Sequence, residues 1–318
     1  MKVAVTGGAG FVGSRLVEVL LDAGHHVRVV DDLSSGCLEN LTGVYGRIAF
    51  VKADVSTREG ADRACSGVDA VVHLAARPSV AESMRATDGL RRANLLTTLR
   101  ILESAERLFV RRVVYASSCS VYAEKSSALA ECDPTGPISP YAEAKFAGEL
   151  AVRAVGEATG VLDTASLRFF NVVGPRQRAS GGYGAVVPSF VDSILDGKMP
   201  LTYGDGEQSR DFVSVNDVAE ALLRAVECPK ALAGRAINVG TGTASTVNEV
   251  FAAAWSATGG CRDNSRRWGA ARQGEMRHAR ANAVRLWEDL GVRCQTSLTE
   301  MVNAYAVWKR EELARCVK

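Results

Sequence analysis

The chain has 318 residues, of which 47% are hydrophobic and 23% charged, and its formal net charge is +2. This length predicts one large domain or two interlocked domains with an ample hydrophobic core. The small net charge argues against a nucleic-acid partner or an acidic membrane surface, and no apolar run reaches the ~20 residues of a membrane span.

The eight cysteines are scattered singly without a Cys-x-x-Cys pair, and only four histidines are present. This usage indicates neither a zinc site nor a redox pair, so we expect no metal. Reduced thiols in the cytoplasm are the simplest interpretation. The segment Met1–Thr6 runs directly into a glycine turn, which predicts a first strand rather than a secretion signal.

The amino-terminal segment predicts a dinucleotide site. Lys2–Thr6 has the composition of a short buried strand, and residues 14–23 form an amphipathic run that predicts a helix. Between them lie Gly7, Gly10 and Gly13. Without side chains, these glycines let the backbone approach a pyrophosphate, whose charge is stabilised at the helix N-terminus.

Asp31 supports this interpretation, because it ends the next predicted strand, 27–30, 18 residues after Gly13. A carboxylate at this position can accept hydrogen bonds from both ribose hydroxyls and would repel a 2′-phosphate. NAD is therefore favoured over NADP. The alternative is that Asp31 only caps a helix or fixes a turn.

Three further predicted strands end at small or polar residues. Ile48–Lys52 leads to Asp54, Ala70–His73 leads to Leu74-Ala75-Ala76, and 112–116 leads to the stretch 117–122. Strands and helices alternate at steps of roughly 25 residues, which predicts an α/β fold with a Rossmann-type doubly wound parallel sheet. Ligands of such sheets bind beyond the carboxyl ends of the strands.

The second half of the chain lacks this alternation and predicts a smaller, mixed α/β substrate-binding lobe. The expected elements are helices at 187–196, 216–227 and 246–258, strands at 164–169 and 236–239, an irregular stretch at 266–274, and two short helices at 282–290 and 298–312. We assign residues 1–170 and about 213–239 to the NAD-binding domain, and about 171–212 and 240–318 to the lobe.

Tyr141 and Lys145 are the candidate catalytic pair. Residues four apart on a helix lie on one face, and a nearby ammonium lowers the pKa of a tyrosine from its usual value of about 10. The pair is then a plausible proton acceptor near neutral pH. Tyrosine and lysine also occur at this spacing by chance.

Several motifs occur together in one order along the chain. They are Thr6-Gly7-Gly8-Ala9-Gly10-Phe11-Val12-Gly13, Asp31-Asp32-Leu33-Ser34-Ser35-Gly36, Ala53-Asp54-Val55, His73-Leu74-Ala75-Ala76, and the stretches 117–122, 141–145, 168–177, 204–212 and 238–242. By these motifs the chain resembles the extended short-chain dehydrogenase/reductase family, most closely its nucleotide-sugar 4-epimerases of the UDP-glucose 4-epimerase type.

The resemblance implies a reaction as well as a fold. Tyr141 would take the proton of the sugar 4-hydroxyl, Lys145 would bind the nicotinamide ribose and lower the pKa of Tyr141, and Ser118 would orient or relay the proton. The hydride would leave C4 for NAD and return to the other face of a transient 4-keto sugar. NAD would be recycled and stay bound.

The resemblance also implies the residues that contact the ligands. The predicted cofactor contacts are Gly7, Gly10, Phe11, Val12, Gly13, Asp31, Asp32, Asp54, Val55, Leu74, Ala75, Ala76, Asn94, Tyr141 and Lys145. The predicted substrate contacts are Ser79, Ser118, Cys119, Ser120, Tyr141, Asn171, Val187, Tyr203, Arg210, Arg272 and Glu275. The expected substrate is a UDP-sugar of the UDP-glucose, UDP-N-acetylglucosamine or UDP-glucuronate type.

Cys119 and Ser120 stand where the 4,6-dehydratases of the family carry an Asp-Glu pair. The absence of carboxylates argues against ordinary dehydration. A dehydratase that uses the Cys119 thiol remains the alternative, although a lone cysteine is more often a small buried hydrophobe. A non-catalytic nucleotide-binding protein and a net dehydrogenase are further alternatives.

Family members often dimerise through two helices of each subunit. Here these would be the helix with Asn94 and the helix with Tyr141. Their outer faces are expected to present Leu95, Leu99, Leu102 and Phe146. The resemblance therefore predicts a homodimer.

Overall fold

The computed structural model describes residues 1–76, 87–158, 160, 162–178, 185–260, 265–271 and 276–316, without the side chains of 87–93 and 316. In this part of the chain a seven-stranded sheet has the order β10-β6-β5-β4-β1-β2-β3, and all neighbouring strands are parallel. The strands are β1 (Lys2–Thr6), β2 (His26–Asp31), β3 (Ile48–Lys52), β4 (Ala70–His73), β5 (Arg112–Ser118), β6 (Asp163–Phe169) and β10 (Arg235–Val239). The predicted doubly wound fold is confirmed.

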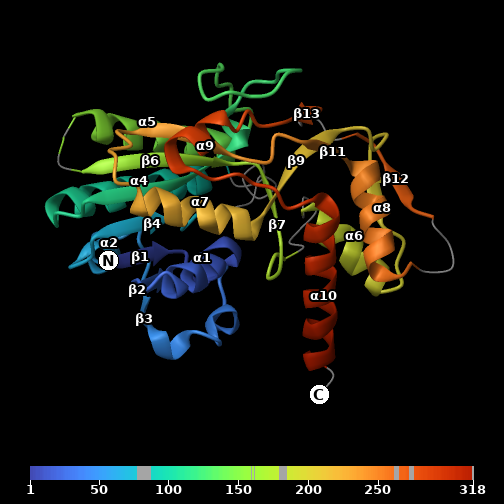
Figure 1. Cartoon of the computed structure of the whole chain (residues 1–318), viewed down its shortest axis with the longest axis horizontal. Helices are drawn as coiled ribbons and strands as arrows, with labels where there is room; N and C mark the ends of the chain where they lie inside the picture. The colour runs from blue at the N-terminus through green and yellow to red at the C-terminus, as the bar shows by residue number, and fades with distance from the viewer. Residues whose placement is uncertain are drawn as a thin grey trace.

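Helices cover both faces of this sheet (Figure 1). On one face lie α1 (Phe11–Asp22) and α7 (Val215–Glu227), and on the other lie α2 (Arg58–Cys65), α4 (Thr87–Arg107) and α5 (Pro140–Ala158). Successive strand residues point to opposite faces. Val3 and Val5 therefore join the core under α1 and α7, whereas Ala4 joins the core under α2 and α4.

The smaller lobe lies beyond the carboxyl ends of the strands (Figure 1). It contains β7 (Asn171–Val173), α6 (Val186–Leu195), β8 (Leu201–Tyr203), β9 (Ser209–Ser214), β11 (Ala244–Thr246), α8 (Val247–Thr258), β12 (Arg267–Gly269), β13 (His278–Ala279) and α10 (Leu298–Cys316). In it β9 pairs with β7, β11 and β13, and β8 pairs with β12. Its core joins α6, α8 and α10.

Three expectations for this half need correction. The last helix, α10, is not short, because it runs for 19 residues and ends at Cys316. The stretch 266–274, expected to be irregular, contains β12. The helix α9 (Val284–Leu290) was expected in the lobe, but Leu286 and Leu290 pack in the core of the large sheet. Apart from the placement of α9, the predicted domain boundaries stay a prediction.

Among the described residues no helix is long and apolar enough to cross a membrane. The same residues contain no group of three or more His, Cys, Asp or Glu side chains that would hold a metal ion.

Candidate active site

The glycine turn brings β1, α1 and β4 into close contact. A Cβ atom on Gly13 would lie 2.2 Å from the carbonyl oxygen of Gly7, and one on Gly7 would lie 2.8 Å from the amide nitrogen of Ala75. Gly7 also has a φ of 71°, which side chains disfavour. Side chains are therefore excluded at Gly7 and Gly13 by packing.

The N-terminus of α1 is open to an anion. The N-cap is Gly10, which has no side chain to cap the helix, and the first turn carries no acidic residue. The first amide groups of a helix have no partner within the helix and attract negative charge. The backbone amides of the first turn of α1, which include those of Phe11 and Val12, therefore fit the pyrophosphate of NAD.

Asp31 holds the turn together and keeps hydrogen-bond acceptor positions for a ligand. Its carboxylate is 6% exposed and accepts hydrogen bonds from the amides of Ala9 and Leu33, each at 2.9 Å. Burial raises the pKa of this carboxyl group, and the two amides oppose that shift. A carboxylate has about four acceptor positions, so Asp31 can fix the turn and also bind ribose hydroxyls.

The other predicted cofactor residues lie at the same edge of the sheet. Asp32 and Asp54 are exposed and accept hydrogen bonds from the amides of Ser34 and Ser56. Val55 is buried, Leu74, Ala75 and Ala76 are half-buried, and Asn94 on α4 is 7% exposed.

Two residues under this edge were missed as functional candidates. The hydroxyl of Thr6 lies 2.8 Å from Nδ1 of His73, and the amide of Ala75 donates to the same hydroxyl at 3.3 Å. His73 is 1% exposed, and burial lowers its pKa to about 3. A neutral imidazole thus supports the strand end that is expected to face the cofactor. The only sequence signal was the position of His73 directly before Leu74-Ala75-Ala76.

Tyr141, Lys145 and Ser118 meet at the carboxyl end of β5. The side chains of Tyr141 and Ser118 interact, and this interaction favours a lower pKa of Tyr141. The ammonium nitrogen of Lys145 lies 5.9 Å from the centre of the Tyr141 ring, and it donates to the carbonyl oxygen of Ala116 at 2.8 Å. Lys145 is 5% exposed. The three predicted catalytic side chains are therefore brought together by α5 and β5.

The pKa of Tyr141 is raised from its usual value, whereas we expected it to be lowered. Burial raises it to about 12, and the interaction with Ser118 opposes that shift. Burial also lowers the pKa of Lys145 to about 8. The protein alone therefore does not show the expected lowering of the Tyr141 pKa, because the loss of water around a phenolate outweighs the interaction with Ser118.

Cys119 and Ser120 follow Ser118 in a 3₁₀ turn at Cys119–Val121. The amide and hydroxyl of Ser120 both donate to the Ser118 hydroxyl, at 3.2 and 3.0 Å. Burial raises the pKa of Cys119 to about 11, against the favourable charge of Arg210. The Cys119 side chain is therefore a neutral thiol at neutral pH.

Arg210 is a predicted substrate contact that lies in the smaller lobe. It lies on β9, is half-buried, and donates to the carbonyl oxygens of Ser209 and Arg277 at 2.9 and 3.2 Å. The charge of Arg210 favours a lower pKa of Cys119, against the effect of burial. Asp211, the next residue, is fully buried and accepts hydrogen bonds from both Thr241 and Gly242.

The remaining lobe residues have different surroundings. Asn171 is half-buried on β7, opposite Phe212 of β9. Tyr203 is half-buried at the end of β8, and a Cβ atom on Gly269 would lie 3.0 Å from its ring. The Val187 side chain has no exposed area and packs in the lobe core, so the predicted contact of this side chain with substrate is corrected to a packing role. Ser79, Arg272 and Glu275 lie outside the described residues.

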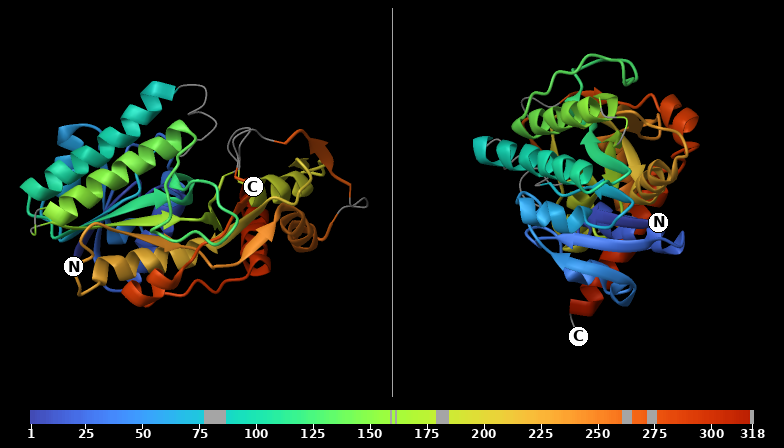
Figure 2. Two further views of the ribbon diagram at one scale, coloured as in Figure 1. Left: turned by 90° about the horizontal axis from the view of Figure 1, so that it is seen from above. Right: turned by 90° about the vertical axis from the view of Figure 1, so that its left-hand side faces the viewer.

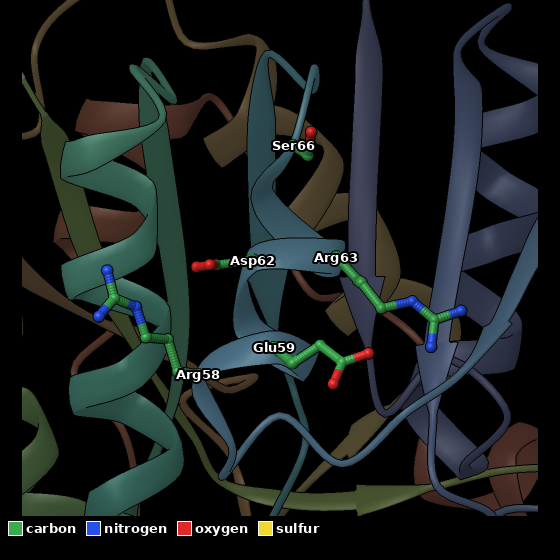
Figure 3. A pocket seen from close by; sticks show the side chains of 5 residues that line it. All are labelled: Arg58, Glu59, Asp62, Arg63 and Ser66. Atoms are coloured by element: carbon green, nitrogen blue, oxygen red, sulfur yellow. The ribbon is translucent and has the colours of Figure 1, made fainter.

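The outer surface of α2 carries an open hollow of about 560 Å³ that is unrelated to this site. Its lining side chains point apart rather than towards a common centre (Figure 3). Asp62 is engaged by Ser104 and Arg107. We assign no function to the hollow.

Comparison with known proteins agrees with the fold. The NAD dependent epimerase/dehydratase family model matches residues 3–240. A UDP-glucose 4-epimerase of Mycolicibacterium smegmatis is 36% identical over 310 residues, which cover 94% of this chain and 96% of that protein.

Solved structures of nucleotide-sugar epimerases and dehydratases have the same fold. The crystal structure of the UDP-glucose 4-epimerase of Thermotoga maritima with UDP-glucose has a TM-score of 0.91 and 34% identity, covering 98% of this chain and all of that chain. The dTDP-glucose 4,6-dehydratase DesIV of Streptomyces venezuelae, with NAD bound, has a TM-score of 0.91 and 31% identity, covering 99% and 98%. The chain therefore belongs to the NAD dependent epimerase/dehydratase family, as the motifs predicted.

Proposed function

We propose that the protein catalyses NAD-dependent epimerisation at C4 of a UDP-sugar through a transient 4-keto sugar. The observation that carries the proposal is the meeting of Tyr141, Ser118 and Lys145 at the carboxyl edge of the sheet. No carboxylate stands at positions 119 and 120 for an elimination. UDP-glucose 4-epimerases among the similar proteins support the same reaction.

In this mechanism Tyr141 reacts as the phenolate, whose oxygen accepts the proton of the 4-hydroxyl group and later returns it. The Ser118 hydroxyl, whose interaction with Tyr141 favours the phenolate, orients that proton. The Lys145 ammonium stabilises the phenolate by its charge. Bound NAD supplies a reversible hydride acceptor, which makes the net redox change zero.

Binding is divided between the two parts of the chain. The glycine turn, the N-terminus of α1 and Asp31 would hold NAD. In the lobe Arg210 would bind the diphosphate, since a guanidinium group forms paired hydrogen bonds with phosphate oxygens. Asn171 and Arg272 are proposed to assist on the diphosphate, Glu275 on the ribose and Tyr203 on the base. Ser79 and Ser120 are proposed to contact the sugar.

Incubation of the protein with UDP-glucose, UDP-N-acetylglucosamine and UDP-glucuronate, with and without added NAD, tests this proposal. We expect NMR to detect the C4 epimer of at least one of these sugars. NADH should not accumulate. If the protein epimerises none of the three nucleotide sugars, the proposal is refuted. Sustained NADH production would instead identify a net dehydrogenase.

A dehydratase is the second candidate, because the Cys119 thiol lies beside Ser118 and DesIV is among the similar structures. With a pKa of about 11 the thiol can donate a proton but is a poor base. Mass spectrometry that shows loss of one water from the sugar, abolished in Cys119→Ala, would establish dehydration. We expect Cys119→Ala to leave epimerisation within a few-fold of wild type.

We further infer a homodimer in the cytoplasm. The cysteines described in the structure are all free, which fits a reducing compartment. Leu96, Leu99 and Leu150 are each about two-fifths exposed on α4 and α5 (40%, 41% and 39%). The expected interface residue Leu102 is instead 4% exposed and belongs to the core, so that assignment is corrected.

A further inference from the structure

A buried ion pair lies beneath the proposed catalytic residues. Glu149 on α5 and Arg168 on β6 have side chains that are 7% and 5% exposed. Nε of Arg168 donates to Oε2 of Glu149 at 3.0 Å, and Nη2 donates to Oε1. Tyr141, Lys145 and Glu149 follow one another at four-residue spacing, so the ion pair is attached to the same face of α5 as the proposed catalytic residues.

The carboxylate of this pair holds the strand end before Ser118. The hydroxyl of Ser117, which is 3% exposed, donates to Oε2 of Glu149 at 2.8 Å. Ser118 is the next residue, and its side chain interacts with that of Tyr141. One carboxylate from α5 therefore fixes the backbone on one side of Ser118.

The guanidinium of the pair holds the other end of the same segment. Its central carbon lies 4.6 Å from the centre of the Tyr122 ring. The Tyr122 hydroxyl donates to Oδ1 of Asn238 on β10 at 2.6 Å. The Asn238 amide in turn donates to the carbonyl oxygens of Leu129 and Asn282 at 2.8 and 3.1 Å. Tyr122 is thus clamped between the guanidinium and β10.

We propose that the Glu149–Arg168 pair positions the segment 118–121 against Tyr141, which makes Glu149 and Ser117 positioning residues for the proposed reaction. Both ends of the segment are attached to one ion pair, and the acidic member of that pair comes from the helix that carries Tyr141. Glu149 does not touch reacting atoms in this arrangement. The inference rests on the proposed function, because it concerns the geometry of that reaction.

A second ion pair provides a matched control. Arg112 and Asp163 join the same two strands, β5 and β6, at their opposite ends, with Nε of Arg112 2.7 Å from Oδ2 of Asp163. Their side chains are 12% and 18% exposed, and Asp163 also accepts backbone amides. Asp163→Asn therefore removes the carboxylate charge of an ion pair that involves β6, as Glu149→Gln does, without touching the Ser118 segment.

The experiment compares Glu149→Gln, Ser117→Ala and Asp163→Asn in the full chain with bound NAD. Small misplacement of reacting groups costs up to about 100-fold in rate. We expect kcat to fall about 10- to 100-fold in Glu149→Gln and about tenfold in Ser117→Ala, with KM changed less than about twofold. In Asp163→Asn the melting temperature should fall while kcat stays within about twofold of wild type.

Hydrogen exchange gives a readout that does not need turnover. The amides of Ser120 and Tyr122 are bonded within the segment, and they should exchange faster in Glu149→Gln and Ser117→Ala than in Asp163→Asn. Unchanged exchange, unchanged kcat in folded Glu149→Gln and Ser117→Ala, or an equal loss of kcat in Asp163→Asn would each overturn the inference. If Glu149→Gln does not fold, Ser117→Ala decides. If the wild type epimerises no sugar, the proposed function fails and the exchange rates still decide the positioning.

Discussion

The ammonium nitrogen of Lys145 lies 5.9 Å from the centre of the Tyr141 ring while it donates to the carbonyl oxygen of Ala116 at 2.8 Å. The lysine is therefore held by the end of β5 rather than by the phenol itself. Burial keeps Tyr141 protonated in the protein alone, with a pKa of about 12. Proton transfer from a sugar hydroxyl then depends on the combined action of Lys145, Ser118 and the bound ligands.

Tyr141→Phe should abolish the proposed proton transfer while the fold remains intact. We expect kcat to fall by about 10² to 10⁴, the usual contribution of a positioned acid or base. Epimer formation measured by NMR gives the rate, and circular dichroism checks the fold. Tyr45→Phe is the matched control, since Tyr45 is 50% exposed and should keep full activity. A Tyr141→Phe protein with more than a tenth of wild-type kcat would contradict the assignment.

Asp31→Asn should weaken the preference for NAD over NADP. The substitution removes the negative charge that would repel a 2′-phosphate and weakens hydrogen bonds to ribose, which are worth about 1.5–3 kcal/mol when one partner is charged. We expect an increase of about tenfold or more in the Kd for NAD, measured by titration calorimetry, and a smaller change for NADP. Asp32→Asn is the control, since Asp32 is an exposed carboxylate bonded to Ser34. It should change the ratio of the Kd for NADP to the Kd for NAD less than Asp31→Asn does. An unchanged ratio in Asp31→Asn would show that Asp31 only fixes the turn.

His73 should make the protein less stable as the pH falls. Its pKa is about 3 in the folded protein against an ordinary value of 6.5, so between these values the unfolded chain binds a proton that the folded chain does not. The free energy of unfolding should then decrease by up to about 1.4 kcal/mol for each pH unit below 6.5. Urea unfolding at several pH values between 7.5 and 4.5 gives the free energy of unfolding as a function of pH. This free energy should fall less steeply with decreasing pH in His73→Asn than in wild type. His26→Asn, at an exposed histidine, should keep the wild-type slope, and an equal slope in all three proteins would contradict the prediction.

Leu99→Glu should convert a dimer into monomers. The helices α4 and α5 run side by side on one face of the sheet (Figure 2), and Leu99 is 41% exposed there. A carboxylate at this position would be buried without a partner in the proposed interface. Size-exclusion chromatography with light scattering gives the mass. Val307→Glu on α10, where Val307 is 53% exposed, should leave the dimer unchanged, and a monomeric wild type would refute the proposed interface.

The local pattern of the sequence predicted much of the fold and of the candidate site. Glycine spacing, strand ends and the Tyr141–Lys145 spacing depend on residues close in the chain, and local geometry restricts them strongly. The parallel sheet and the meeting of Tyr141, Lys145 and Ser118 followed from these signals. The family motifs in the same segments led to the nucleotide-sugar reaction.

Only the tertiary structure decided which groups lose contact with water. The upward pKa shift of Tyr141, the packing of Val187 and Leu102 in cores, and the Glu149–Arg168 pair all depend on side chains from distant segments. Desolvation and the pairing of buried charges are set by the whole surroundings of a group. For this reason the sequence predicted most residues of the candidate site, and the packing of α5 against β5 and β6 determined how these residues are buried and supported.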